Sequence, residues 1–207
     1  MAYFPMFLDI KDKKCLIIGG GEIAYRKLCI LHEFGADITL IAEDIDEKIY
    51  DFKDITILKQ SYHENYLKSN VVVIAATNNN ELNHEIAESC RQQGILVNAV
   101  DMKADCDFIF PSYIKKDEIV AAFSSSGLSP IITQYLKEQN ETIITEELVS
   151  TAKLLGSLRP IVKKRILSYQ LKKKLYNELF SKALIQELTE NDIEEIIAAY
   201  EKQDTNN

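Results

Sequence analysis

The chain has 207 residues, enough for one domain of ordinary size or for one domain and a smaller unit. Hydrophobic residues make up 46% of it and charged residues 27%, so a sizeable core is possible and a disordered or collagen-like chain is excluded. Its 32 Asp and Glu against 24 Lys and Arg give a formal net charge of −8, which argues against a general affinity for nucleic acid or an anionic membrane.

No apolar run approaches the ~20 residues of a membrane span, and the N-terminus lacks the basic-then-apolar order of a secretory signal. We therefore expect a cytoplasmic protein with no membrane partner. The four cysteines lie apart within apolar patterns, and the three histidines are scattered. This spacing predicts reduced core thiols and no metal site.

Residues 14–97 alternate between strand-like and helix-like segments. Apolar runs predict strands, and amphipathic runs that stop at Gly35 and Gly94 predict helices. The predicted strands are 15–18, 38–42, 55–58, 71–76 and 95–97, and the predicted helices are 22–34 and 81–93. This alternation predicts an α/β fold of the Rossmann type, a doubly wound parallel sheet covered on both faces.

The pattern changes after Asp101. Apolar runs predict strands over 108–110 and 119–123, and the sequence SSSGLSP at 124–130 opens a helix predicted over 130–139. Beyond Glu146, leucine and isoleucine recur at helical spacing, so the C-terminal third is predicted to be a small helical unit. We expect its polar tail, 202–207, to be loose.

The first candidate site is the glycine-rich sequence GGGEIA at 19–24, between a predicted strand and a predicted helix. Gly19 permits a tight turn, and Gly21 lets a pyrophosphate approach the backbone at the helix start. The next strand ends at Glu43, about 20 residues further on, where a carboxylate can pair with a ribose 2′-hydroxyl. The pattern predicts a dinucleotide site and favours NAD over NADP. Asp44 lies beside Glu43 and could make the same contact with the ribose. The alternative to a dinucleotide site is a glycine turn that serves packing alone.

Polar residues also follow two later strands. Thr77 and Asn78 come after the strand predicted at 71–76, where they could face the cofactor or merely cap the next helix. Asp101 follows the strand predicted at 95–97. Its carboxylate could take a proton while the nicotinamide takes a hydride, unless it is only a turn residue.

Two features of the second half could bind an anion. Ser124 and Ser125 precede a helix start, where hydroxyls and amides gather, although an ordinary serine-rich cap is the alternative. The interval 151–177 holds eight Lys and Arg and no acid, and includes Lys163, Lys164 and Arg165. We interpret it as a positively charged surface that binds a polyanionic small molecule. The alternative is a helix face that is merely solvated.

Several blocks of the sequence closely resemble the precorrin-2 dehydrogenases, the N-terminal module of siroheme synthases. The blocks are YFPMFLDIKDKKCLIIGGGEIAYRK, AATNN, VNAVDMKADCDFIFPSYI and AAFSSSGLSP. The resemblance implies NAD-dependent oxidation of precorrin-2 to sirohydrochlorin in siroheme biosynthesis. It also implies a homodimer, with an NAD-binding domain over 1–112, a connecting and dimerisation region over 113–146, and a helical tetrapyrrole-binding domain over 147–207.

Where the motifs match, the resemblance assigns the cofactor loop to Glu22 and Ile23, the end of the second strand to Glu43 and Asp44, the catalytic aspartate to Asp101, and a hydroxyl of the substrate site to Ser125. This chain has Ser126 where the family's SSGG-type segment has a glycine. Precorrin-2 is a polycarboxylate, so the basic interval suits such a substrate.

Two other functions stay open at this point. A bifunctional relative would also insert iron into sirohydrochlorin. A non-catalytic NAD-binding regulatory module would need the glycine loop but neither Asp101 nor the basic interval.

Overall fold

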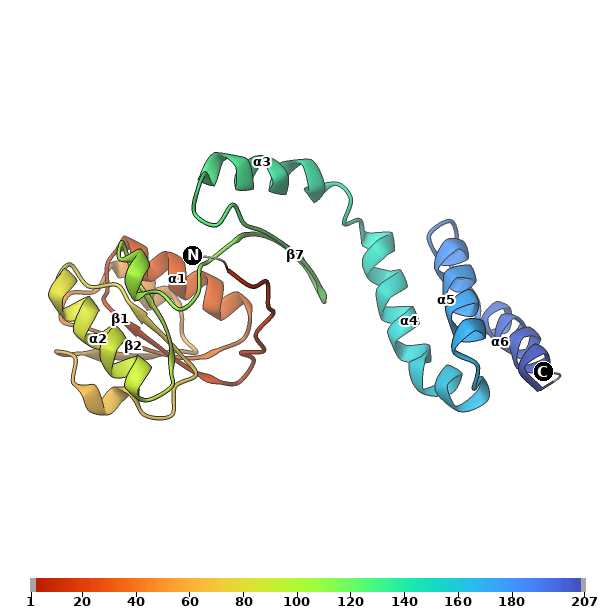
Figure 1. The fold of residues 1–207 in the computed structure, drawn as a ribbon, viewed down its shortest axis with the longest axis horizontal. Helices are drawn as coiled ribbons and strands as arrows, with labels where there is room; N and C mark the ends of the chain where they lie inside the picture. Colours follow the sequence, from red (N-terminus) through yellow and green to blue (C-terminus); the bar gives the residue numbers. More distant parts are fainter. Residues whose placement is uncertain (1–2, 206–207) are drawn as a thin grey trace. The chain divides into compact units, whose positions relative to one another are not determined.

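The structure is a computed structural model that describes residues 3–205, and the chain divides into two compact units between Phe110 and Pro111 (Figure 1). No helix in the described part of the chain is both long enough and apolar enough to cross a membrane.

The first unit is built on a five-stranded sheet in the order β3-β2-β1-β4-β5, in which every neighbouring pair is parallel. The strands are β1 (Lys14–Ile18), β2 (Asp37–Ala42), β3 (Thr56–Lys59), β4 (Val72–Ala75) and β5 (Leu96–Ala99). The helices are α1 (Glu22–Glu33) and α2 (Asn80–Gln92), with short 3-10 helices η1 (Glu47–Asp51), η2 (Glu64–Leu67) and η3 (Lys103–Asp105). This is the predicted α/β fold of the Rossmann type, and the strand order reverses between β1 and β4.

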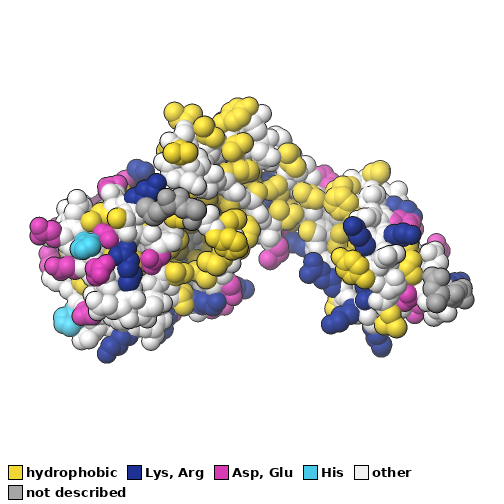
Figure 2. All heavy atoms as spheres, in the orientation of Figure 1, with side chains coloured by type: hydrophobic (Ala, Val, Ile, Leu, Met, Phe, Trp, Pro, Cys, Tyr) yellow, Lys and Arg dark blue, Asp and Glu magenta, His cyan; other side chains and the backbone are white. Residues whose placement is uncertain are grey.

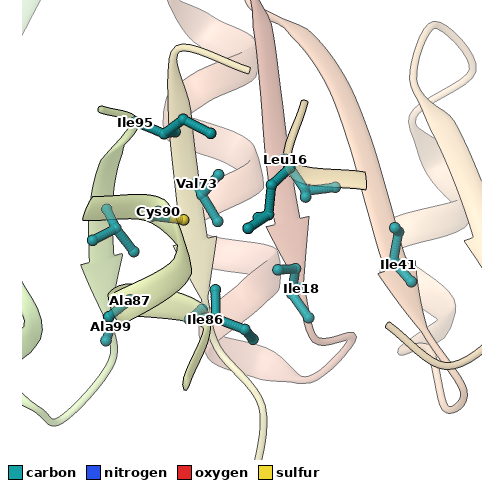
Figure 3. Close-up of a cluster of buried hydrophobic side chains, with 12 residues drawn as sticks. Leu16, Ile18, Ile41, Val73, Ile86, Ala87, Cys90, Ile95 and Ala99 are labelled. Carbon is teal, nitrogen blue, oxygen red and sulfur yellow. The ribbon is translucent and has the colours of Figure 1, made fainter. Parts of the chain in front are cut away.

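Both faces of the sheet are buried. Leu16 and Ile18 of β1 point to the face that α2 covers, and Cys15 and Ile17 point to the face that α1 covers. Figure 3 shows the first cluster, where Ile86 and Cys90 of α2 lie over the strands. Because side chains on both faces are removed from water, the strands read as continuous apolar runs.

All four cysteines are free thiols, but only Cys15 and Cys90 are buried as predicted, whereas Cys29 and Cys106 are half-buried. Burial raises the pKa of Cys15 to about 11 and that of Cys90 to about 12, so both side chains pack as uncharged core groups.

The second unit begins with an antiparallel hairpin, β6 (Ser112–Lys116) and β7 (Ile119–Phe123), followed by α3 (Pro130–Glu141), α4 (Glu146–Arg165), α5 (Tyr169–Ala183) and α6 (Glu190–Thr205). Ile114 of the hairpin packs with Ile144 and Val149, at the start of α4. A separate apolar cluster joins α4, α5 and α6 around residues such as Val162, Leu175 and Ile197.

Two sequence-based expectations for local structure were wrong. Residues 108–110 form no strand. The rings of Phe108 and Phe110 lie 5.5 Å apart between centroids and pack against the core, and the strand begins after Pro111 instead. The polar tail is not loose as far as Thr205, because α6 continues to that residue. There the Asp204 carboxylate accepts the backbone N–H of Ser168 at 3.1 Å, and Ser168 is the N-cap residue of α5. Asn206 and Asn207 lie outside the described residues.

Candidate cofactor and substrate site

A cavity of about 710 Å³ opens at the carboxyl ends of four strands. Its walls include the glycine loop after β1, the residues that follow β2 and β3, and the turn after β4. Six predicted residues meet there: Gly19, Gly21, Glu43, Asp44, Thr77 and Asn78. Gln60, Ser61 and Tyr62, which follow β3, line the same cavity and were not predicted as site residues.

The three glycines of the loop do different things. A Cβ on Gly19 would lie 2.2 Å from the carbonyl oxygen of Ala76, and Gly19 has a φ of +125°, which only glycine adopts readily. A Cβ on Gly20 would lie 2.2 Å from the carbonyl oxygen of Asp44. A Cβ on Gly21 would have no heavy atom within 4 Å. The first two glycines therefore let backbone segments approach closely, whereas the third leaves open space beside the cavity.

The start of α1 is suited to an anion. Gly21 is the N-cap residue, so no side chain caps the N–H groups of the first turn. Glu22 and Ile23 follow in that turn. The Glu22 carboxylate pairs with Arg26 at 3.2 Å and with Lys48 at 3.5 Å. Uncapped amides at the positive end of a helix beside an open cavity fit the pyrophosphate of a dinucleotide.

Asn83, a buried residue of α2, holds the turn after β4. Its Oδ1 accepts the Thr77 hydroxyl at 2.7 Å and the Thr77 backbone N–H at 3.1 Å. The cap of α2 is Asn79, whose Oδ1 accepts the N–H of Glu81 at 3.0 Å. Neither Thr77 nor Asn78 is thus the N-cap residue of that helix.

Asp101 lies in the turn after β5, at the same end of the sheet, but does not line the cavity. Its φ of +62° is left-handed, a conformation that Asp tolerates better than most residues. The neighbouring Val100 donates its N–H to the carbonyl of Ala75 at 2.9 Å, which ties the turn to the end of β4.

A buried carboxylate clamps the segment that follows Asp101. Asp105 accepts from the His84 ring at 2.8 Å and from Arg91 at 3.4 Å, and Arg91 also donates to the carbonyl of Ala104 at 2.8 Å. The hydrogen bond to Asp105 raises the pKa of His84 above its ordinary value of 6.5. Separations of 14 and 21 residues along the chain hid this cluster from sequence reasoning.

The serine segment lies in the second unit. Ser124 Oγ accepts the N–H of Ser126 at 3.0 Å, and Ser125 Oγ accepts the N–H of Ser129 at 3.0 Å. Ser129 is the residue that caps α3. Ser126, which stands where the resembling family has glycine, has a left-handed φ of +55°, and this explains why glycine suits the position.

The three basic residues at the end of α4 are not equivalent. Lys163 and Lys164 are exposed, and Figure 2 shows several Lys and Arg side chains on the helical part of this unit. Arg165 pairs with Glu194 at 2.7 Å and with Glu201 at 2.6 Å, both on α6. The interval without acids in the sequence therefore has acidic neighbours in the fold.

Comparisons with known proteins agree with this geometry. A family model described as "Putative NAD(P)-binding" matches residues 6–112. Siroheme synthases of Nitrosococcus oceani and Buchnera aphidicola are 31% and 32% identical to the chain, over 97% and 98% of it but only 44% and 43% of their own lengths. The chain thus spans less than half of these relatives. The solved structure of SirC, a precorrin-2 dehydrogenase, shares the fold with a TM-score of 0.69 at 21% identity, covering 97% of this chain and 100% of that one.

The glycine loop yields a first prediction. Gly21→Leu should fold normally but lose dinucleotide binding, because its side chain fills open space beside the cavity. Gly19→Ala should lower the melting temperature, since strained backbone of this kind costs on the order of 1–3 kcal/mol. Calorimetric titration with NAD and thermal melts measure the two effects. Unchanged NAD affinity in Gly21→Leu would place the cofactor elsewhere.

The His84–Asp105 pair predicts a pH dependence of stability. The pKa of His84 is higher in the folded state than in the unfolded state. The pair therefore makes its full contribution to the free energy of unfolding below pH 6.5, and this contribution is lost as pH rises through the raised pKa. The melting temperature of the wild type should therefore lose this contribution as the pH rises above 6.5, and that of His84→Gln should not. His63→Gln is the control, because the His63 ring accepts the backbone N–H of Asn65 at 3.2 Å rather than pairing with a carboxylate among the described residues. Parallel pH profiles for wild type and His84→Gln would show that the pair adds nothing.

Proposed function

The chain belongs to the NAD(P)-binding family, and we propose that it uses NAD to oxidise precorrin-2 to sirohydrochlorin in siroheme biosynthesis. The observation that carries the proposal is the cavity at the ends of β1 to β4, with Asp101 at the end of the adjoining strand. Relatives named siroheme synthase, aligned along nearly the whole chain, support this substrate.

The cavity fits a dinucleotide. Glycine backbone and uncapped N–H groups at the start of α1 would hold the pyrophosphate, with Glu22 and Ile23 contributing main-chain amides. Glu43 and Asp44 would face the adenosine ribose, and Thr77 and Asn78 would border the nicotinamide half. We propose NAD rather than NADP because Glu43, Asp44 and Asp46 line the cavity and would repel a 2′-phosphate.

The oxidation removes one hydride and one proton from precorrin-2. When bound, the nicotinamide ring of NAD⁺ supplies the hydride acceptor. We propose that the Asp101 carboxylate accepts the proton, as the catalytic residue. The clamp formed by Asp105, His84 and Arg91 would keep the Asp101 turn in place during this step.

We propose that the second unit supplies the substrate contacts. The hydroxyl of Ser124 and the exposed ammonium groups of Lys163 and Lys164 would bind substrate carboxylates. The Ser125 hydroxyl donates to the Ser129 carbonyl at 3.1 Å and would exchange that bond for one to the substrate. The pairing of Arg165 with two α6 carboxylates supports a different role for that residue, namely fixing the end of α4 that carries the two lysines. This gives residues 147–207 the role of a tetrapyrrole-binding domain.

Residues 113–146 are proposed to form the interface of a homodimer. The side of α3 away from the hairpin presents large apolar side chains, with Ile131 81% and Tyr135 58% exposed, and Leu128, just before the helix, is 87% exposed. An apolar surface of this kind is costly in water and suits a second copy of the chain. Analytical ultracentrifugation should then report twice the mass of one chain.

Turnover is the direct test. Purified protein with NAD and freshly made precorrin-2 should produce NADH and the absorption spectrum of sirohydrochlorin together. NAD binding without turnover would instead favour a regulatory module. Faster insertion of Fe²⁺ or Co²⁺ into sirohydrochlorin with the protein than without it would identify a bifunctional enzyme.

Asp101→Asn separates catalysis from structure. Asn also tolerates the left-handed φ of this position, so the turn should persist. Loss of the proton acceptor should lower kcat by on the order of 10²–10⁴, with the NAD Kd and the melting temperature nearly unchanged. Steady-state kinetics and thermal melts measure this split. A variant that is less stable but oxidises precorrin-2 at the normal rate would make Asp101 a turn residue only.

Charge reversal tests the two exposed lysines. Lys163→Glu combined with Lys164→Glu should raise the KM for precorrin-2 several-fold, more at low salt than at high salt, because screening weakens exposed charges. The NAD Kd should stay at its wild-type value. Lys202→Glu, an exposed lysine on α6, is the matched control. An unchanged KM at low salt would mean that the lysines only solvate the helix.

A further inference from the structure

The cavity wall after β3 contains a contact that bears on cofactor choice. Ser61 Oγ donates a hydrogen bond to Oε1 of Glu43, and both residues line the cavity. They come from different strands. β2 and β3 are parallel neighbours with Ala42 opposite Lys59, so the residues that follow each strand emerge side by side.

The contact restrains a carboxylate that would otherwise move freely. Glu43 is exposed and lies just beyond the last residue of β2. A free glutamate side chain in this position samples several rotamers, and ordering it costs about 0.5–1.5 kcal/mol when a ligand binds. The bond from Ser61 fixes one carboxylate oxygen and leaves Oε2 to accept from a ligand hydroxyl.

The charge of the cavity makes this restraint selective. None of the described residues that line it is Lys or Arg, whereas three are acidic. A ribose 2′-hydroxyl can donate to Glu43, but a 2′-phosphate would bring about two negative charges against it with no cation to compensate. A carboxylate held at the cavity by Ser61 cannot swing away to relieve that repulsion.

We infer that Ser61 is a positioning residue that sets the preference for NAD over NADP by holding the Glu43 carboxylate at the ribose position. The inference rests on the proposed function, because it assumes that this cavity takes the dinucleotide. It also separates the two acids after β2: Glu43 makes the selective contact, and Asp44 contributes its backbone, which packs against Gly20.

Binding measurements on three variants test it without any turnover. Calorimetric titrations should give Ser61→Ala a Kd for NAD about 2–10-fold weaker than wild type, as expected for losing one preordered side chain. Its Kd for NADP should stay the same or become tighter, since Glu43 is released. Ser61→Thr keeps the hydroxyl and should restore the wild-type ratio. Ser150→Ala removes a hydroxyl that donates to the Glu147 carbonyl at 3.0 Å on α4 and should change neither Kd.

A double-mutant cycle tests whether Ser61 affects cofactor preference through Glu43. In a Glu43→Gln background, Ser61→Ala should add no further change in the NAD to NADP ratio, because the two residues act as one unit. Equal weakening of both cofactors by Ser61→Ala, or no weakening of either, would overturn the inference and leave the proposed function standing. A wild-type chain that binds neither dinucleotide would overturn the proposed function and this inference together.

Discussion

Close backbone contacts at Gly19 and Gly20 determine how the rest of the site is built. The end of β1 lies so near the carbonyls of Ala76 and Asp44 that no side chain fits between them. These contacts bring the segments after β2 and β4 to the start of α1 and create the cavity among them. The glycine loop is therefore both a packing element and a binding element, and the two roles fall on different glycines.

Second contacts then fix the polar groups around that cavity. Buried Asn83 of α2 holds the Thr77 turn, and Ser61, in the segment after β3, donates a hydrogen bond to the Glu43 carboxylate. At the edge of the sheet, Asp105 ties the segment after Asp101 to His84 and Arg91. These bonds are made within the protein itself, so the polar groups around the cavity are held before any ligand binds.

The sequence predicted the parallel sheet well, because strands buried on both faces read as continuous apolar runs and because the glycine-rich sequence GGGEIA follows the first of them. It missed β6, whose alternation of Ser112, Tyr113, Ile114, Lys115 and Lys116 has one fully buried position and no apolar run. It also missed Ser61, Asn83 and the His84–Asp105 pair, since each contact joins residues that only the fold brings together.

The basic interval is a second case in which the sequence alone could not predict how side chains are paired. Counting along the chain gave an uninterrupted positive segment, but α6 folds back and places Glu194 and Glu201 against Arg165. Lys163 and Lys164, two residues and one residue earlier, remain exposed. The local sequence gives the number of charged residues in a segment. Whether those charges are neutralised depends on which helices pack together. The roles of these residues, like that of Asp101, stay predictions.

The central claim is that one cavity, built from the ends of four strands, takes the dinucleotide. A backbone amide NMR titration with NAD tests it most directly, since each amide reports its own surroundings. We expect shifts confined to residues 19–24, 43–46, 60–62 and 76–78, and none at the hairpin formed by β6 and β7. Shifts that leave 19–24 unperturbed, or that centre on another surface, would contradict the account.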